Sequence, residues 1–302
     1  MRLASLLVDD QPVLAALVDG KYRNLSAADP SLGTDLSALL SSGADAMDRA
    51  RAALGSAEVI PGSFRYRPVV PNPPAFYCLG LNDVDHAAEA KLPVPEFPVI
   101  FTRLPSTLIG HREPMLRPPE SHMLDYEVEL AVVIGTGGRR IPQERALEHV
   151  AGYTVFNDGS IRDWQVATHQ WTIGKNFHGT GALGPDLVTP DELPPGAAGL
   201  KLATHVGDEQ LQSGDTGAFV FDVARTIALL SVACELQAGD VIAMGTPSGI
   251  GFARKPPRYL VPGETCSVSI ESIGVLDSPI VDEDVQAAAI IESLPLKSGG
   301  SK

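Results

Sequence analysis

Short runs of apolar and β-branched residues, separated by Gly, Pro and Asp, constrain the possible folds more than any other feature. They are "EVELAVVIG" from Glu127, "AGYTVFND" from Ala151, "LKLATHVG" from Leu200, "DVIAMG" from Asp240 and "TCSVSIESIG" from Thr265. Segments of this length, bounded by turn residues, are typical of β-strands. We therefore predict an α+β protein that is mostly β from about residue 71 to residue 290.

Two segments of this region favour helices, namely "PQERALEHV" from Pro142 and "FVFDVARTIALLSVACEL" from Phe219. The apolar residues of the second segment are dense enough for a buried helix. Upstream, the sequence predicts a short strand pair around "LVDGKYRNL" and a helix at about residues 35–54.

The Pro-rich segment "RPVVPNPPAF" divides the chain, because such a segment is extended and suits a linker. It predicts a small N-terminal domain at residues 1–70 and a second domain at residues 71–290. The polar end "SLPLKSGGSK" predicts a flexible tail at residues 291–302.

The excess of acidic side chains limits the partners of this chain. Asp and Glu number 37 against 23 Lys and Arg, and the formal net charge is -14. This charge repels nucleic-acid phosphates and anionic membrane surfaces, so neither is an expected partner. An anionic substrate would need local positive charge from a metal ion or from a few Lys and Arg side chains.

Cysteine usage and hydropathy favour a cytoplasmic protein. Cys78, Cys234 and Cys266 lack the paired spacing of zinc sites and disulfide frameworks, so we expect reduced, buried thiols. Asp9 and Asp10 interrupt the first apolar run before a secretory signal could form. No apolar run approaches the roughly 20 residues that span a bilayer.

Three acids alternate with other residues in "LDYEVELAVVIG", and on a strand Asp125, Glu127 and Glu129 would project from one face. Such a face can be the solvated side of an edge strand. The apolar continuation "LAVVIG" indicates instead a strand that enters a core, where crowded carboxylates are better explained by a hard cation such as magnesium. Asp158 ends another apolar run and is the best third ligand, although Asp-Gly is also a common hairpin turn.

The sequence also offers candidates for a general base and for an anion-binding group, but their patterns are less specific than that of the carboxylates. His86 and Glu89 are three residues apart, so one helical turn would let the carboxylate raise the basicity of the imidazole. The same spacing also occurs in solvated pairs on exposed helices. Lys175 follows a strand-like run between Trp171 and Phe177, and is either a surface lysine or a partly buried anion-binding group. The Gly-rich "GTPSGIGFAR" lacks nucleotide-binding spacing and favours close approach of backbone to a ligand or metal.

Four of these segments, in this order, resemble motifs of the fumarylacetoacetate hydrolase family. They are "GLNDVDHAAE", "DYEVELAVVIG", "GYTVFNDGSIRDWQ" and "GDVIAMGTPSGIG", and the resemblance covers about residues 76–280. It implies a mixed β-roll with a short lid and a twofold homodimer. It also implies Mg²⁺ or Mn²⁺ on Glu127, Glu129 and Asp158, catalytic roles for His86, Glu89 and Lys175, and substrate contacts from Arg162, Gln165, Lys175 and Thr246.

Three positions depart from the family pattern. Asp83 stands where the family usually has Tyr, His178 where Asp often follows the "GK" segment, and Arg103 where Lys is common. The strand segment with Glu127 and Glu129 and the pair His86 and Glu89 match the family pattern. These departures therefore bear on the identity of the substrate.

The resemblance implies hydrolysis of a carbon–carbon bond in a small anionic 2,4-dioxo acid, such as an acylpyruvate of aromatic catabolism. In this reaction His86 with Glu89 would activate water, and Lys175 with Gln165 would stabilise the developing oxyanion beside the metal. The alternative is an isomerase of a hydroxymuconate-type diene acid or an oxaloacetate-type decarboxylase, because the same site serves all three reactions.

Overall fold

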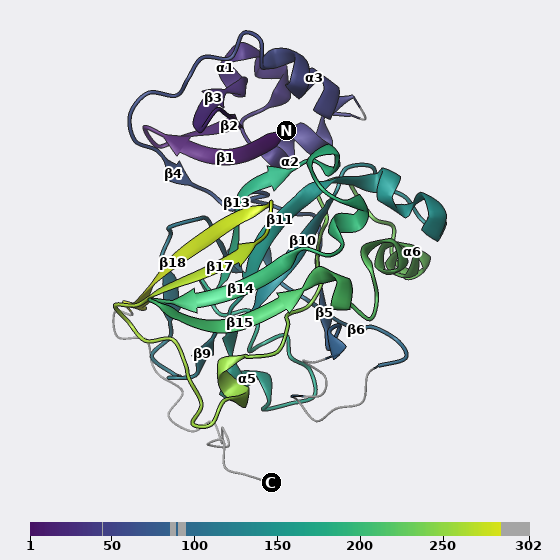
Figure 1. Cartoon of the computed structure of the whole chain (residues 1–302). Helices are drawn as coiled ribbons and strands as arrows, with labels where there is room; N and C mark the ends of the chain where they lie inside the picture. Colours follow the sequence, from purple (N-terminus) through teal and green to yellow (C-terminus); the bar gives the residue numbers. More distant parts are fainter. Residues whose placement is uncertain (44, 85–88, 90–94, 285–302) are drawn as a thin grey trace.

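The computed structural model describes the chain except residues 44, 85–88, 90–94 and 285–302. The predicted tail and His86 therefore lie outside the described residues. The predicted fold class is confirmed, because strands dominate and form two large sheets (Figure 1).

The larger sheet has eleven strands: β1 (Arg2–Val8), β2 (Gln11–Val18), β3 (Lys21–Asn24), β4 (Arg65–Tyr66), β5 (Phe76–Gly80), β6 (Val99–Thr102), β7 (Leu108–Ile109), β10 (Val128–Ile134), β11 (Val150–Asp158), β13 (Gly181–Val188) and β16 (Val241–Ala243). Their order is β3-β2-β1-β13-β11-β10-β16-β5-β6, with β4 paired to β1 and β7 paired to β13. The two predicted site strands, β10 and β11, are therefore neighbours inside the sheet.

The smaller sheet has the order β15-β14-β17-β18-β8, with β8 (Met115–Arg117), β14 (Lys201–Val206), β15 (Glu209–Asp215), β17 (Thr265–Ile270) and β18 (Gly274–Asp282). A separate pair joins β9 (Leu124–Asp125) to β12 (Ser160–Ile161). The five sequence runs predicted to be strands form β10, β11, β14, β16 and β17, so these predictions are confirmed.

Helices are short and lie mostly at the periphery: α1 (Leu25–Ala28), α2 (Leu36–Ser41), α3 (Ala46–Ala53), α5 (Arg162–Gln165) and α6 (Val223–Ala233). The 3-10 helices are η1 (Pro30–Leu32), η2 (Pro105–Thr107), η3 (Gln143–His149), η4 (Pro190–Glu192), η5 (Pro195–Ala197), η6 (Thr216–Ala218) and η7 (Gly251–Ala253).

One helix prediction needs correction, and a second is refined. The single helix expected at residues 35–54 is two helices, because Gly43 has a φ of 125° that a continuous right-handed helix does not allow. The helix expected at "PQERALEHV" is present, and it is the 3-10 helix η3. The helix expected around residues 219–236 is confirmed as α6, whose N-cap Asp222 accepts a hydrogen bond from the Arg225 amide, but only one face of α6 is buried and Val232 is exposed.

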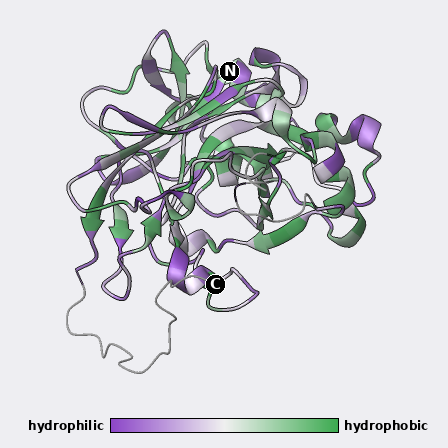
Figure 2. Ribbon diagram, turned by 60° about the horizontal axis from the view of Figure 1, so that its bottom comes forward, coloured by the Kyte–Doolittle hydropathy of each residue, from purple (hydrophilic) through white to green (hydrophobic). Residues whose placement is uncertain are grey.

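Alternate residues of β10 face two different cores. Val128 and Leu130 pack in a cluster that includes Val268 of the smaller sheet. Ala131 packs in a second cluster on the opposite side. Because side chains alternate along a strand, buried Glu129 projects to the same side as Ala131. Hydrophobic residues lie mostly in the strands, and hydrophilic residues lie mostly in loops and peripheral helices (Figure 2).

The N-terminal strands continue the sheet that carries the site strands. β1 pairs with β13 through Arg2↔Val188 and Leu3↔Leu187. The predicted domain boundary near residue 70 stays a prediction, and the sheet crosses it. No described helix is both long and apolar enough to traverse a bilayer. Cys78 and Cys266 are buried as expected, whereas Cys234 is partly exposed.

A buried carboxyl group lies at this junction. Asp186 of β13 accepts a 2.7 Å hydrogen bond from the Tyr22 hydroxyl of β3. Burial raises the pKa of Asp186 to about 6, although the Tyr22 hydrogen bond and the charge of Arg2 oppose this shift. An unfolded Asp has a pKa of about 3.9. Between roughly pH 4 and 6 the folded state therefore binds more protons, and the contribution of Asp186 to the free energy of unfolding falls as the pH rises.

We expect Asp186→Asn to remove this fall, which amounts to about 3 kcal/mol between pH 4 and 7. Asn remains uncharged and can still accept the Tyr22 hydrogen bond. Urea unfolding from pH 4 to pH 7.5 measures the effect. Asp191→Asn is the control, because a Thr189 hydrogen bond lowers the pKa of this exposed carboxyl group. Parallel pH profiles for wild type and Asp186→Asn would contradict the prediction.

Candidate active site

Three carboxylates converge where β10 and β11 run side by side. Glu129 lies in β10, Glu127 directly precedes this strand, and Asp158 ends β11, with its amide donating to the Glu127 carbonyl at 2.9 Å. One oxygen from each carboxylate lies within 4.8 Å of the others, and all three residues are buried. The solvated-edge alternative is therefore wrong. The hairpin-turn alternative for Asp158 is also wrong, because Asp158 pairs with Gly181 of β13.

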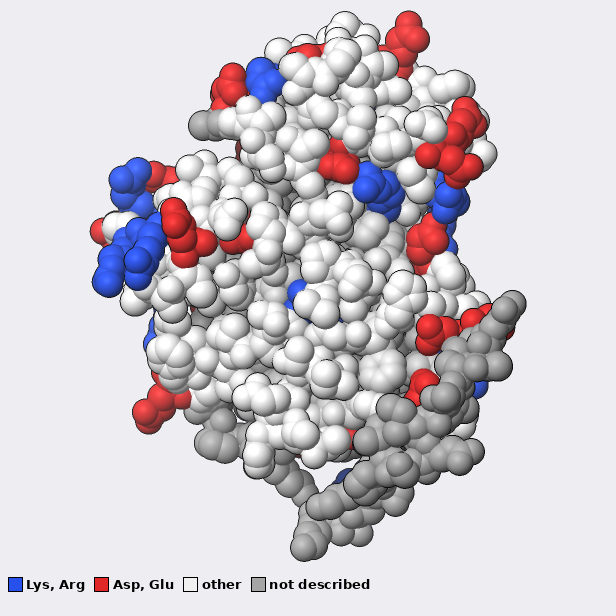
Figure 3. All heavy atoms as spheres, turned by 180° about the vertical axis from the view of Figure 1, so that it is seen from behind, with Lys and Arg blue, Asp and Glu red and all other residues white. Residues whose placement is uncertain are grey.

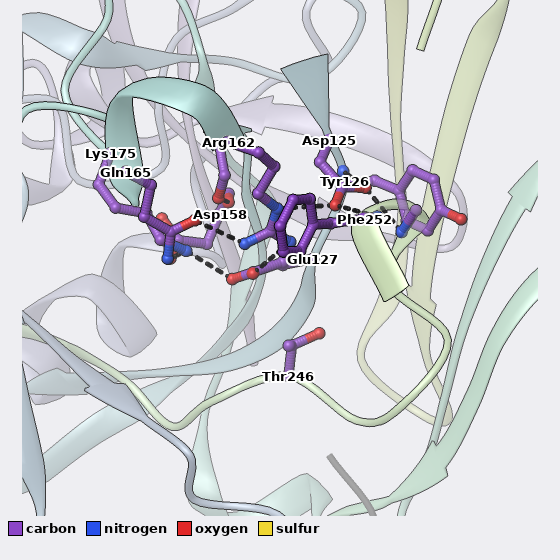
Figure 4. A network of polar contacts seen from close by, with 12 residues as sticks. Asp125, Tyr126, Glu127, Asp158, Arg162, Gln165, Lys175, Thr246 and Phe252 are labelled. Atoms are coloured by element: carbon purple, nitrogen blue, oxygen red, sulfur yellow. Dashed lines mark hydrogen bonds and ion pairs between the residues drawn. The ribbon is translucent and has the colours of Figure 1, made fainter. Parts of the chain in front are cut away.

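Buried cations offset much of the negative charge. The Lys175 ammonium lies 2.6 Å from Glu127 Oε2 and 2.6 Å from Asp158 Oδ2. Arg162 Nη2 forms an ion pair with Glu127 Oε1 at 2.7 Å. Figure 4 shows Lys175 and Arg162 approaching Glu127 from different directions. Buried charges of one sign are tolerated when such partners surround them.

The carboxylates fit a hard divalent cation. Burial, followed by the negative charges of Asp158 and Glu127, raises the pKa of Glu129 well above its usual range. Glu129 also accepts a 2.9 Å hydrogen bond from the Gly245 amide, which fixes one of its oxygens. A divalent cation relieves such crowding, and three carboxylate ligands suit Mg²⁺ or Mn²⁺ better than zinc.

Lys175 is fully inside the protein, although the expected strand before it is a turn. Gly174 makes this possible, because a Cβ there would overlap the backbone of Gln165. Burial alone would lower the pKa of Lys175, but the charges of Asp158 and Glu127 outweigh it and raise the pKa. These carboxylates therefore favour the charged form of Lys175, and the surface alternative is wrong because the side chain is buried.

Short helix α5 presents Arg162 and Gln165 beside the carboxylates. Arg162 Nε donates to Asp125 Oδ2 at 2.7 Å, and Arg162 Nη1 donates to Gln165 Oε1 at 2.8 Å. Thr246 lies across from these groups in Figure 4, and its hydroxyl oxygen accepts a 2.9 Å hydrogen bond from Gln212.

These groups open into a cavity of about 350 Å³. Its wall also carries apolar side chains: Leu79, Phe101, Val166, Trp171, Ile250 and Phe252. Glu89 lines the same cavity, and both of its carboxylate oxygens accept from the Gly249 amide, at 3.0 and 3.1 Å. The structure therefore places Glu89 in the wall of the cavity that Glu127 and Glu129 also line. The expected catalytic pair of Glu89 with His86 stays a prediction.

Two further buried charged residues belong to the site, Arg103 and Asp125. Asp125 was expected on the same strand as Glu129, but it lies in β9, which pairs with β12, whereas Glu129 lies in β10. Arg103 Nη1 donates to Asp158 Oδ1 at 2.6 Å, and Arg103 Nη2 donates to Thr180 at 2.8 Å. Asp125 binds Arg162. The sequence carried only a weak signal for these two roles. Arg103 stands where the family commonly has Lys, and the only signal for Asp125 was its alternation with Glu127.

The other departures lie apart from the carboxylates. His178 is exposed. Asp83 is buried, forms a β-bridge with Phe219, and lines a separate depression with Lys201 and Ser213.

Comparisons with known proteins agree with this geometry. Residues 75–281 match the family model described as fumarylacetoacetate (FAA) hydrolase C-terminal. The chain is 40% identical over 266 residues to a Homo sapiens protein named oxaloacetate tautomerase FAHD2A, mitochondrial, covering 87% of this chain and 84% of that protein.

Solved structures are similar over nearly the whole chain. A fumarylacetoacetate hydrolase from Exiguobacterium antarcticum has a TM-score of 0.82 and 32% identity, covering 94% of this chain and 100% of that chain. Maleylpyruvate hydrolase from Sphingobium sp. SYK-6, in complex with manganese(II) and pyruvate, has a TM-score of 0.77 and 25% identity at the same coverage.

Proposed function

Because the chain belongs to the fumarylacetoacetate hydrolase family, we propose that it is an enzyme that interconverts the enol and keto forms of a small anionic 2-oxo acid of the oxaloacetate type. The observation that carries this proposal is the cluster of three buried carboxylates, of which Glu127 and Glu129 line the cavity together with Lys175. The 40% identity to a protein named oxaloacetate tautomerase supports the type of reaction.

Tautomerisation moves one proton between C3 and the 2-oxygen of the acid. A Mg²⁺ or Mn²⁺ ion held by Glu127, Glu129 and Asp158 would supply a Lewis acid for the 2-oxo group. The Lys175 ammonium would stabilise negative charge that develops on the oxygen while the proton is in transit. Glu89, with His86, is our candidate for the group that takes and returns the C3 proton.

Arg162 and Gln165 would orient the substrate. The Gln165 amide oxygen accepts from Arg162, so Gln165 offers its amide N–H groups as donors to a carboxylate. Thr246 lines the opposite side of the cavity. The apolar wall would exclude water and strengthen the electrostatic contacts.

Carbon–carbon bond hydrolysis is the second candidate, and likeness to a maleylpyruvate hydrolase favours it. Both reactions pass through an enolate of a 2-oxo acid. They differ in the role of the proposed base, because hydrolysis requires a water activated by that base, whereas tautomerisation requires proton transfer at C3.

An assay of enol-oxaloacetate separates the two candidates. We expect the protein with Mg²⁺ or Mn²⁺ to accelerate the loss of enol absorbance without releasing pyruvate, and we expect EDTA to stop this acceleration. Parallel assays with acylpyruvates and maleylpyruvate measure cleavage. Enol loss at the spontaneous rate, together with cleavage of an acylpyruvate, would favour the hydrolase and reject the tautomerase.

We also propose a homodimer formed largely by residues 71–290, because sheet edges must be covered. Figure 3 shows a face whose middle carries few charged side chains, which is the composition of an interface core. A cytoplasmic location stays a prediction.

A further inference from the structure

Asp125 has no role in the proposed chemistry, yet it is fully buried beside the cavity. Its carboxylate accepts from Arg162 Nε at 2.7 Å, from the Gly251 amide at 2.8 Å and from the Phe252 amide at 2.9 Å. One carboxylate thus binds a site arginine and two successive amides of a cavity loop (Figure 4).

The loop that Asp125 binds forms part of the cavity wall. Ile250, Phe252 and Ala253 line the cavity, and the Gly249 amide binds Glu89. The loop packs closely, because a Cβ at Gly251 would overlap both Asp125 Oδ1 and the Arg258 carbonyl. The position of this wall therefore depends on Asp125.

The other end of the connection is a carboxylate of the proposed metal site. Arg162 bridges Asp125 and Glu127, with Nε on the first and Nη2 within 2.7 Å of the second. A planar guanidinium cannot shift at one edge without moving the other. A displaced Arg162 would therefore change the orientation of Glu127.

We propose that Asp125 is a positioning residue that couples the position of loop 249–253 to the metal affinity of Glu127 through Arg162. This inference rests on the metal site of the proposed function. It predicts that a change in the loop, at a residue that does not contact a metal ligand, weakens metal binding.

The first variant is Asp125→Asn, which keeps one acceptor oxygen but turns an N–H donor toward Arg162 or a loop amide. We expect Mn²⁺ to bind about 10-fold more weakly, as when groups that hold a metal ligand are altered. Electron paramagnetic resonance of Mn²⁺ measures the affinity. We also expect faster trypsin cleavage after Arg254, because the loop loses an anchor.

Asp240→Asn is the matched control. Asp240 is equally buried and accepts from the Ala75 and Gln237 amides, but does not line the cavity. Its substitution should leave both Mn²⁺ affinity and cleavage after Arg254 unchanged.

Gly251→Ala tests the connection from the loop side and keeps the charge of Asp125. It should also weaken Mn²⁺ binding, and it decides the question if Asp125→Asn fails to fold. Wild-type Mn²⁺ affinity in both variants would overturn the coupling and leave the proposed function intact. A wild-type protein that binds no Mn²⁺ would overturn the metal site and this inference together.

Discussion

Glu129→Gln should lower turnover roughly 1,000-fold, because it removes one charged member of the proposed set of three metal ligands. Gln has almost the same shape and can still accept from the Gly245 amide. Since burial and neighbouring carboxylates raise the pKa of Glu129, a neutral side chain there should fold well without metal. The loss should therefore fall on metal binding and activity.

Two measurements separate this effect from a loss of structure. Thermal unfolding in EDTA should place the Glu129→Gln variant at or above the wild type in stability. Mn²⁺ titration should then show weak binding. Full turnover by the variant with Mn²⁺ would show that Glu129 is not a ligand.

Lys175→Met should change turnover and metal affinity in opposite directions. Met fills similar space without charge, so about 100- to 1,000-fold of turnover should be lost with the stabilisation of the developing oxyanion. The ammonium also neutralises Glu127 and Asp158 from 2.6 Å each. Without it their negative charge is less compensated, and Mn²⁺ should bind about 10-fold more tightly.

The assay should use Mn²⁺ at saturation, so that binding does not limit the rate. Lys201→Met is the control, because Lys201 is exposed and lies outside the cavity. Weaker Mn²⁺ binding by Lys175→Met would mean that Lys175 holds the carboxylates in place and does not compete for their oxygens.

The clustering of the three carboxylates was predictable, because its cause is local. Alternation along a strand and the apolar run after Glu129 were enough to place two acids at the edge of a core. Asp158 followed from the end of a second strand. The strands themselves carry short runs of β-branched residues, so β10, β11 and β17 needed no information from the rest of the chain.

The remaining site residues depend on contacts between distant segments. Arg103 reaches Asp158 across 55 positions, and Arg162 reaches Asp125 across 37. The burial of Lys175 depends on Gly174 packing against α5. By contrast, the break between α2 and α3 had a local cause in Gly43, which a helix interior disfavours.

The pairing of β1 with β13 has a consequence for the order in which the protein can assemble. The Met1 carbonyl accepts from Thr189, 188 positions later in the chain. At ribosomal rates of about 5–20 residues per second, the first strands would wait roughly 10–40 s for their partner to be synthesised. β4 pairs with Leu6 and Leu7 much earlier, but during that interval the edge of β1 at Arg2 and Leu3 stays open and another nascent chain can join it. Correct assembly of the sheet that carries the candidate site thus depends on protection of β1 until β13 has been made.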